Sequence, residues 1–308
     1  MDMMPVAEFV VTNALLLVLL TMASTLAVVF IAWHLFNRVR VPIWSLAVDG
    51  WDALRNSSIA TRLRNRSSMW SAVLDRPLSS PVYLGLHTAL GFLLLAPALA
   101  LFLSLADEVM ENDWLTRFDV ALATLLARTA SSEVLVAAAM VTRLGDALTL
   151  YVLGAIVALV LCIRRDWLIL SGWLITTIGN GLLIRLLKGA IQRSRPEHLH
   201  GLVAEGSYSF PSGHSQGSMV VYGMLAYLIA RALPASVATA WQYAIMVAAG
   251  VLVMVVGVSR IVLHVHYFSD VIAGFACGVC WLALCITGLE MALRHYRRLG
   301  EVGQAVSV

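Results

Sequence analysis

Charged side chains are scarce in this chain of 308 residues: Asp, Glu, Lys and Arg make up 13% of it, whereas hydrophobic residues make up 60%. Soluble domains carry about 25% charged residues, so the composition excludes an ordinary water-soluble globule. The net charge of +3 is too small to indicate a nucleic-acid partner. The apolar residues form long runs, not the short alternating segments of a membrane β-barrel. The sequence therefore predicts an all-α polytopic membrane protein.

Cysteine and lysine are also rare. The chain has four cysteines, all within apolar runs, and Lys188 is the only lysine among its 21 basic residues. Cys277 and Cys280 form a C-x-x-C, but the second ligand pair of a zinc site and the βαβ pattern of a redox site are missing. The cysteines are therefore predicted to be packing residues, whereas Lys188 falls within a motif.

Seven apolar runs reach the roughly 17–25 residues that a transmembrane helix requires. The first, Phe9–Phe36, is too long for the core of a signal peptide, so we expect a retained helix. An Arg-rich segment with interspersed Trp, 37–81, follows it. The six other predicted spans are 82–106, 146–163, 167–187, 214–232, 242–259 and 267–289.

The arginines predict the orientation of these spans, because cytoplasmic loops carry an excess of basic residues. With seven spans, the main Arg-bearing regions fall on one side, taken as cytoplasmic: 37–81, Arg164 with Arg165, Arg231, and the tail after the last span. The opposite side then carries the acidic segment 107–133, predicted to be a short non-spanning helix. Segments 188–213 and 260–266 face the same way.

Three polar clusters stand against the apolar background. They read K-x6-R-P at Lys188, Arg195 and Pro196; P-S-G-H at Pro211, Ser212, Gly213 and His214; and S-R-x5-H-x3-D at Ser259, Arg260, His266 and Asp270. The predicted topology places all three at one membrane face. Ionisable groups beside spans are costly and usually mark function.

The residue types of these clusters suit a tetrahedral oxyanion. Lys188, Arg195 and Arg260 supply three cations, and guanidinium groups match phosphate oxygens in a bidentate manner. Ser212 and Gly213 precede a predicted helix, whose first backbone N–H groups favour anions. Such a set of donors also stabilises charge during phosphoryl transfer.

The same clusters hold a candidate nucleophile and a candidate acid. His266 and Asp270 are spaced i,i+4, so on a helix the carboxylate can orient the imidazole. His264 is a rival nucleophile, but its spacing of six turns it away from Asp270, and we interpret it as a polar turn residue. His214 remains to protonate the leaving oxygen.

Together these residues resemble the signature of the type 2 phosphatidic acid phosphatases, or lipid phosphate phosphatases, which share a site plan with vanadium haloperoxidases. The resemblance covers about residues 82–290. It implies that His266 attacks phosphorus to form a phosphohistidine, that Asp270 orients it, and that His214 is the acid and later activates water. Lys188, Arg195, Ser212, Gly213 and Arg260 would hold the phosphate, and the resemblance implies no metal or other cofactor.

The resemblance also implies a domain organisation. A six-span phosphatase domain, 82–290, would follow an extra N-terminal helix with its Arg-rich cytoplasmic loop, 1–81, and precede a cytoplasmic tail, 291–308. We expect a bacterial inner-membrane protein whose site faces the periplasm or the outside. Its oligomeric state is left open.

The substrate is open among lipid phosphates: undecaprenyl diphosphate, phosphatidate, phosphatidylglycerol phosphate or phosphorylated lipid A. Transfer of the phosphoryl group to a lipid hydroxyl and hydrolysis of a soluble phosphate ester are the alternative reactions. A non-enzymatic scaffold is disfavoured, because unused buried charges are costly.

Four further polar features are interpreted structurally. Arg143 and Asp146 are expected to form an ion pair, and Arg185 is expected to snorkel toward the interface in preference to contacting phosphate. The polar residues of 197–205 are interpreted as a solvated loop. Cys162 and Cys285 join the other cysteines as packing residues.

Overall fold

The computed structural model describes residues 56–57, 60–62, 81–111, 114–196, 206–234 and 238–306, among which it has helices and no strand. The chain divides into two compact units, one of residues 23–90 and the other of residues 1–22 and 91–308. The predicted span Phe9–Phe36 and most of segment 37–81 lie outside the described residues.

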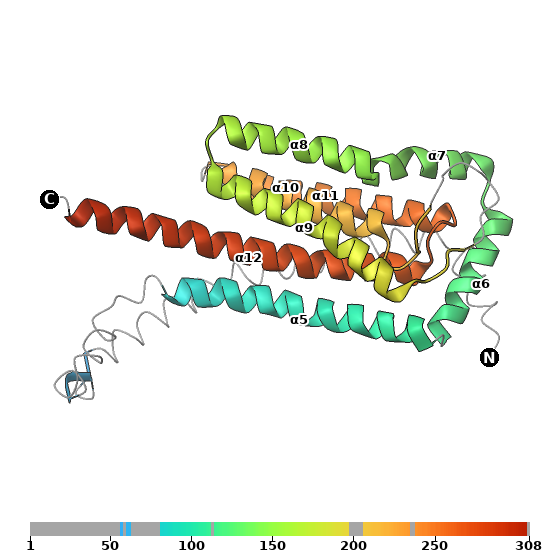
Figure 1. The fold of residues 1–308 in the computed structure, drawn as a ribbon, viewed down its shortest axis with the longest axis horizontal. Helices are drawn as coiled ribbons and strands as arrows, with labels where there is room; N and C mark the ends of the chain where they lie inside the picture. Colours follow the sequence, from blue (N-terminus) through green and yellow to red (C-terminus); the bar gives the residue numbers. More distant parts are fainter. Residues whose placement is uncertain are drawn as a thin grey trace. The chain divides into compact units, whose positions relative to one another are not determined.

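Helices α5 to α12 follow one another along the chain, and the longest connection, residues 192–212, joins α9 to α10 (Figure 1). Their bounds are Pro81–Glu111 (α5), Trp114–Thr129 (α6), Ser132–Thr142 (α7), Arg143–Gly145 (the 3-10 turn η1), Ala147–Ile163 (α8), Trp167–Ile191 (α9), Gly213–Ala232 (α10), Ala238–Val262 (α11) and Phe268–Val306 (α12).

Within the described part of the chain, four stretches are long and apolar enough, by length and composition, to cross a membrane: Ser132–Ile163, Trp167–Ile191, Ala240–Val262 and Phe268–Tyr296. They overlap with four of the seven predicted spans. Helices α5 and α10 lie at the positions of two more, and α6 occupies the predicted acidic helix. The prediction of an all-α, multi-pass membrane protein is thus confirmed.

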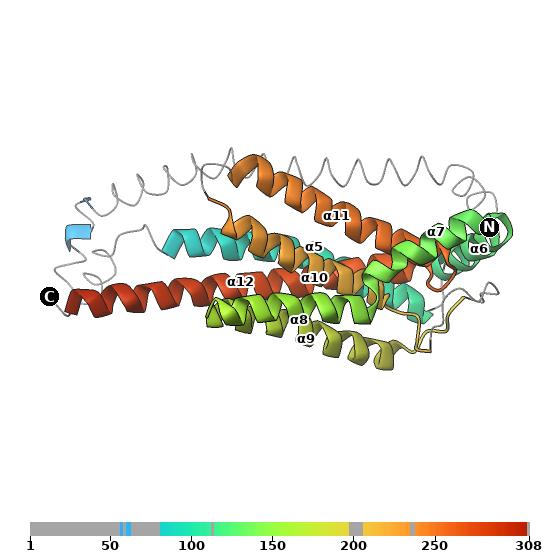
Figure 2. The same cartoon turned by 90° about the horizontal axis from the view of Figure 1, so that it is seen from above.

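Helix α10 is central: it packs against α8, α9, α11 and α12. Trp173, Val221, Met224 and Leu289 form part of the buried apolar core between α9, α10 and α12. Close approach at the start of α10 depends on Gly274 of α12, where a Cβ atom would lie 2.7 Å from the backbone oxygen of Ser212. Seen from above, α10 lies between α11 on one side and α8 and α9 on the other (Figure 2).

The antiparallel helices bring separate motifs to one end of the bundle. Helices α9 and α11 end where α8, α10 and α12 begin, and α6 crosses this same end (Figure 1). The buried face of α6 consists of Leu115, Asp119 and Leu122, which share a face because they are spaced i, i+4, i+7. One member of this otherwise apolar face is a carboxylate.

Candidate active site

The three motifs meet at this end. Lys188 lies in the last turn of α9, Gly213 and His214 in the first turn of α10, and Arg260 in the last turn of α11. His266 lies in the turn before α12, and Asp270 in the first turn of α12. Arg193 and Arg195 follow α9. The positive end of α10 and the basic side chains therefore face the same region.

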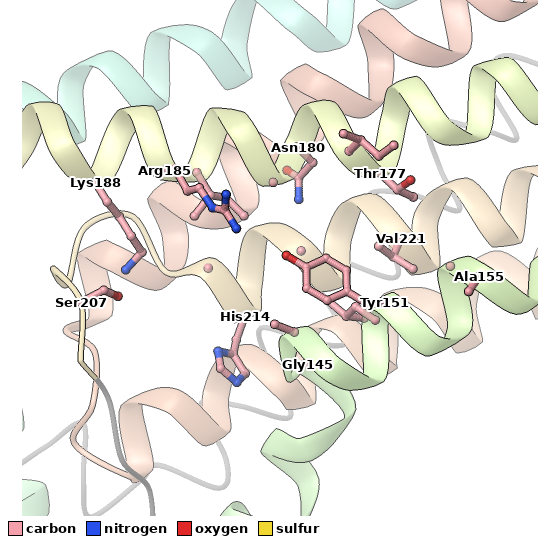
Figure 3. Close-up of a pocket in the computed structure, with 18 of the residues that line it drawn as sticks. Gly145, Tyr151, Ala155, Thr177, Asn180, Arg185, Lys188, Ser207, His214 and Val221 are labelled. Atoms are coloured by element: carbon pink, nitrogen blue, oxygen red, sulfur yellow. The ribbon is translucent and has the colours of Figure 1, made fainter. Parts of the chain in front are cut away.

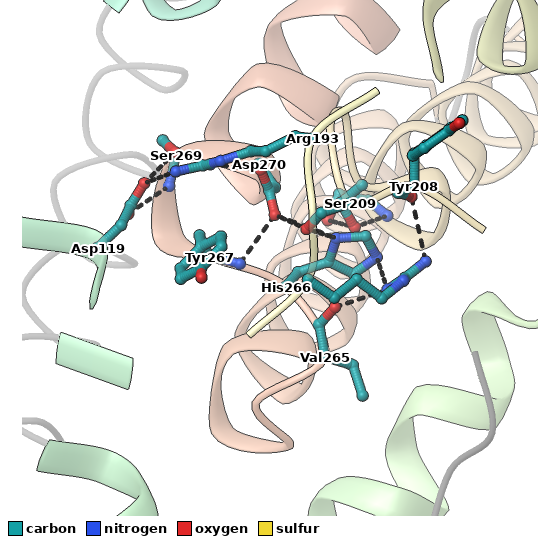
Figure 4. A network of polar contacts seen from close by, with 12 residues as sticks. Asp119, Arg193, Tyr208, Ser209, Val265, His266, Tyr267, Ser269 and Asp270 are labelled. Atoms are coloured by element: carbon teal, nitrogen blue, oxygen red, sulfur yellow. Dashed lines mark hydrogen bonds and ion pairs between the residues drawn. The ribbon is translucent and has the colours of Figure 1, made fainter. Parts of the chain in front are cut away.

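The contacts of His266 determine which of its ring nitrogens carries the proton. Nδ1 lies 3.4 Å from Oδ2 of Asp270, and Nη1 of Arg195 lies 3.1 Å from Nε2 (Figure 4). A carboxylate only accepts and a guanidinium only donates, so the proton is on Nδ1 and the lone pair is on Nε2. The Asp270 carboxylate is held in turn by the hydroxyl of Ser209 and by the N–H of Tyr267, at 2.9 Å from the latter.

Burial keeps the His266 ring neutral. The side chain is almost fully buried, and this desolvation lowers its pKa to about 3. Asp270 opposes the shift, whereas the positive charges of Arg195 and Arg260 reinforce it. A neutral imidazole with its lone pair on Nε2 is the protonation state that a nucleophile requires.

The three predicted phosphate-binding cations are held by backbone or hydroxyl oxygens. Lys188 donates from Nζ to the backbone oxygen of Tyr208. Arg195 donates to the backbone oxygens of Ser207 and Val265, each at 2.6 Å. Arg260 is fully buried and donates to Oγ1 of Thr142 at 2.7 Å.

Ser212 and Gly213, the two predicted phosphate-binding residues at the start of α10, have different surroundings. Ser212 is buried and caps α10, accepting a hydrogen bond from the N–H of Ser215 at 3.4 Å, and its own N–H donates to the backbone oxygen of Asp270 at 3.0 Å. Ser212 therefore ties the start of α10 to α12. Gly213 lines the cavity described below. That either residue binds phosphate stays a prediction.

His214 has a carboxylate partner, Asp146, for which the sequence predicted a different partner. Its Nε2 donates to Oδ1 of Asp146 at 2.8 Å. The prediction that Asp146 pairs with Arg143 is wrong, because Asp146 follows the 3-10 turn in an extended conformation and caps α8 beside α10. Gly145 permits this approach, since a Cβ atom there would lie 3.0 Å from the His214 ring.

A second carboxylate and Arg193 extend the network behind Asp270. Arg193 donates from Nη1 to Asp270 at 2.6 Å and from Nη2 to Asp119 at 2.9 Å, and it stacks 4.3 Å from the centroid of the Tyr267 ring (Figure 4). Asp119 also accepts from the N–H of Ser269 at 3.1 Å. Burial lowers the pKa of Arg193, but the two carboxylates outweigh it and raise that pKa.

Sequence reasoning did not find Arg193 or the role of Asp119. Arg193 was one of the unassigned positions within K-x6-R-P, and Asp119 was counted only as part of an acidic segment. The available signal was the position of Asp119 on the apolar face of α6, between Leu115 and Leu122. A buried carboxylate on such a face requires a cation or several donors.

A cavity of about 360 Å³ begins at the site and continues between α8, α9 and α10 (Figure 3). Its polar end contains Lys188, Arg195, Ser207, His214 and His266. Away from that end the lining is mainly apolar, with residues such as Leu150, Ala155, Ala158, Leu174, Ile178 and Val221. One cavity thus joins the candidate catalytic groups to hydrophobic helix surfaces within the predicted spans.

His264 lies in the turn with a positive φ of 53° and is buried. It does not line the cavity, whereas His266 does. The predicted solvated loop residues 197–205 lie outside the described residues. Among the described residues, no group of three His, Cys, Asp or Glu side chains is arranged to hold a metal ion.

Residues 167–294 match the PAP2 superfamily. This part contains all three motifs, and the match confirms the resemblance that the sequence predicted.

Proteins similar to this chain are phosphatases by name. Phosphatidylglycerophosphatase B of Bacillus subtilis is 37% identical over 117 residues, which are 38% of this chain and 56% of that protein. Lipid A 1-phosphatase of Rhizobium johnstonii is 36% identical over 119 residues, 35% of this chain and 43% of that protein. The matches thus span about half the length of these relatives.

A solved structure extends the likeness. The crystal structure of a transmembrane PAP2-type phosphatidylglycerolphosphate phosphatase from Bacillus subtilis is similar with a TM-score of 0.57 and 28% identity. The match covers 64% of this chain and 96% of that one. The structural similarity therefore covers a larger share of this chain than the sequence matches do.

Proposed function

We propose that this protein is a lipid phosphatase that removes phosphate from a phosphomonoester or diphosphate of a lipid. The observation that carries the proposal is the single cavity that joins the imidazoles and cations to an apolar surface between α8, α9 and α10. A water-soluble phosphate ester needs no such apolar extension. The names of the similar proteins support phosphatidylglycerol phosphate and lipid A phosphate as candidate substrates, beside undecaprenyl diphosphate and phosphatidate.

The geometry of His266 supports a two-step mechanism. In the first step, Nε2 attacks phosphorus, the bond from phosphorus to the lipid oxygen breaks, and His214 gives its proton to that oxygen. Lys188, Arg195 and Arg260 stabilise the charge on the non-reacting oxygens. Asp270 keeps the Nδ1 proton in place and stabilises the positive charge that develops on the ring.

In the second step, water attacks the phosphohistidine. His214 takes a proton from the water, the P–N bond breaks, and inorganic phosphate leaves with His266 neutral again. Transfer to a lipid hydroxyl would follow the same path with a different acceptor. The residues supply the positive charge that a metal ion provides in other phosphatases, so the proposed reaction requires no metal.

We further propose that the site faces the periplasm or the outside of the cell. Arg164 and Arg165 lie between α8 and α9, at the bundle end opposite the site (Figure 1). Arg231 lies at the end of α10 that is remote from His214. The excess of basic residues in cytoplasmic loops supports this orientation.

The test is release of inorganic phosphate by the purified full-length protein in detergent. The panel consists of phosphatidylglycerol phosphate, phosphatidate, undecaprenyl diphosphate, lipid A phosphate and a soluble sugar phosphate. We expect turnover of at least one lipid and little of the sugar phosphate. Preference for the sugar phosphate, or transfer without phosphate release, would replace the proposal by the corresponding alternative.

A further inference from the structure

We propose that Arg185 forms a second anion-binding subsite, for a phosphate group that lies between the scissile phosphate and the hydrocarbon chains of the substrate. The inference rests on the proposed function and narrows its substrate class. It favours lipids with two phosphates in series, in which a phosphodiester or a diphosphate links the scissile group to the lipid. Phosphatidate, with a single phosphate, would leave Arg185 unused.

The first argument is the position of Arg185 on α9. Arg185 precedes Lys188 by three residues, so the two side chains share a helix face. Three residues of α-helix advance about 4.5 Å along the axis. Figure 3 shows Arg185 extending from α9 into the cavity, between Lys188 and Asn180. The guanidinium group of Arg185 thus lies farther along the cavity than Lys188, toward the apolar lining.

The second argument is the cost of a charge at this depth. Arg185 lies within the candidate span Trp167–Ile191, six residues before its end, which is about 9 Å along the helix. Among the described residues, no carboxylate forms an ion pair with it. An arginine within a span is costly and faces a functional cavity in most cases. An anionic group of the substrate would offset that cost.

The third argument is the distribution of cations in the site. Lys188, Arg195 and Arg260 come from the three motifs and surround the catalytic imidazoles. Arg185 belongs to none of the motifs and lines the cavity on the far side of Lys188 from Ser207 (Figure 3). After His214 has protonated the leaving oxygen, the part of the substrate next to that oxygen extends past Arg185. A second phosphate there would receive the planar, bidentate contact that guanidinium provides.

The experiment compares substrates in mixed micelles, with the same acyl chains in phosphatidylglycerol phosphate and phosphatidate. Phosphatidylglycerol phosphate carries a phosphodiester as its second phosphate, undecaprenyl diphosphate carries an adjacent phosphate, and phosphatidate carries none. We expect Arg185→Gln to lower the ratio of kcat/KM for a two-phosphate lipid over that for phosphatidate by about 10- to 100-fold, the range of a charge-assisted hydrogen bond. Arg185→Lys should retain part of the preference.

The arms of this experiment identify the ligand. If the ratio of kcat/KM over that for phosphatidate falls for phosphatidylglycerol phosphate alone, the subsite binds a phosphodiester. If it falls for undecaprenyl diphosphate alone, the subsite binds a diphosphate. Arg164→Gln is the matched control, because Arg164 is exposed at the opposite end of the bundle, and it should leave the ratio unchanged. An unchanged ratio in Arg185→Gln, which snorkelling of Arg185 predicts, overturns the subsite.

A binding measurement separates this inference from the catalytic proposal. In a His266→Ala background, native mass spectrometry of the full-length protein reports the retention of phosphatidylglycerol phosphate relative to phosphatidate without turnover. Arg185→Gln should abolish the preference for the two-phosphate lipid. If the wild-type protein releases no phosphate but this preference depends on Arg185, the phosphatase proposal fails and the subsite stands. If the His266→Ala protein, in which Arg185 is intact, retains both lipids equally, the subsite is overturned.

Discussion

Oδ1 of Asp146 lies 2.8 Å from Nε2 of His214, although the two residues are 68 positions apart in the sequence. The pair repeats, for the proposed acid, the arrangement of Asp270 with the proposed nucleophile His266. In each pair a carboxylate occupies one ring nitrogen and leaves the other to the reaction. The cavity is thus lined by two imidazoles that are each oriented by a carboxylate.

Asp146→Asn tests the role of this carboxylate as a positioning group. The amide keeps the shape but not the charge that stabilises the protonated ring, so we expect kcat to fall about 10- to 100-fold, below the full effect of a general acid. KM should change less than threefold, because Asp146 does not hold the phosphate. Asp166→Asn is the control, since this exposed carboxylate lies at the far end of α8. A change in KM without a fall in kcat, or an equal fall in kcat in both variants, would contradict the assignment.

Removal of Arg193 should destabilise the protein strongly. Arg193→Ala leaves the buried Asp119 and Asp270 without their shared cation. Breaking a buried pair in this way costs about 3–5 kcal/mol. The thermal midpoint in detergent measures the effect against Arg164→Ala, which breaks an exposed pair worth about 1 kcal/mol or less. Similar midpoints for the two variants would show that the network contributes little to stability.

Substitution of Asp119 tests whether the same network supports catalysis. Asp119→Asn keeps hydrogen-bonding capacity toward Ser269 and Arg193 but removes a charge on α6. We expect a lower kcat at nearly unchanged KM, because the position of Arg193 against Asp270 becomes less defined. Burial raises the pKa of the Asp119 carboxyl group by more than Ser269 and Arg193 lower it. Full activity of a folded Asp119→Asn protein would limit the network to a structural role.

His266→Ala should abolish phosphate release, whereas His264→Ala should retain most of it. Only His266 combines the Asp270 contact with a place on the cavity. The wild-type pH profile provides a second test. A base with a lowered pKa remains neutral until the pH falls through that pKa, so protonation of His266 should limit the rate only near pH 3. Equal losses in the two variants would contradict the choice of nucleophile.

The proposed reaction should be insensitive to chelators and sensitive to orthovanadate. Lys188, Arg195 and Arg260 provide the charge stabilisation, and vanadate adopts the five-coordinate geometry of the phosphoryl-transfer transition state, whose mimics bind tightly. Phosphate release with and without EDTA, and across a vanadate series, checks both statements. Activity that is lost in EDTA and restored by magnesium would contradict them.

Much of the helical framework follows from the sequence alone. The predicted spans 167–187 and 267–289 correspond to α9, Trp167–Ile191, and to the apolar part of α12, which begins at Phe268. Long apolar runs specify such helices because a backbone within a membrane must satisfy its own hydrogen bonds. The three motifs were equally visible, since their charged residues stand next to those runs.

The pairing of side chains depends on tertiary structure. Asp146 was predicted to pair with its sequence neighbour Arg143, but the extended conformation after η1 directs it to His214. Arg193 meets Asp119 across 74 positions and Asp270 across 77. Periodicity and spacing describe only neighbours within a few turns, so partners brought together by helix packing leave no local signal.

The sequence by itself thus determined the all-α membrane class, the three motifs and the i,i+4 spacing of Asp270 from the proposed nucleophile His266, because each of these is a local property of composition or helix periodicity. The tertiary structure decided which carboxylate serves His214, which cation connects Asp119 to Asp270, and that Arg185 faces the cavity. Those relationships depend on how α6, α8, α9, α10 and α12 pack, and close approaches such as that at Gly274 set the distances between them.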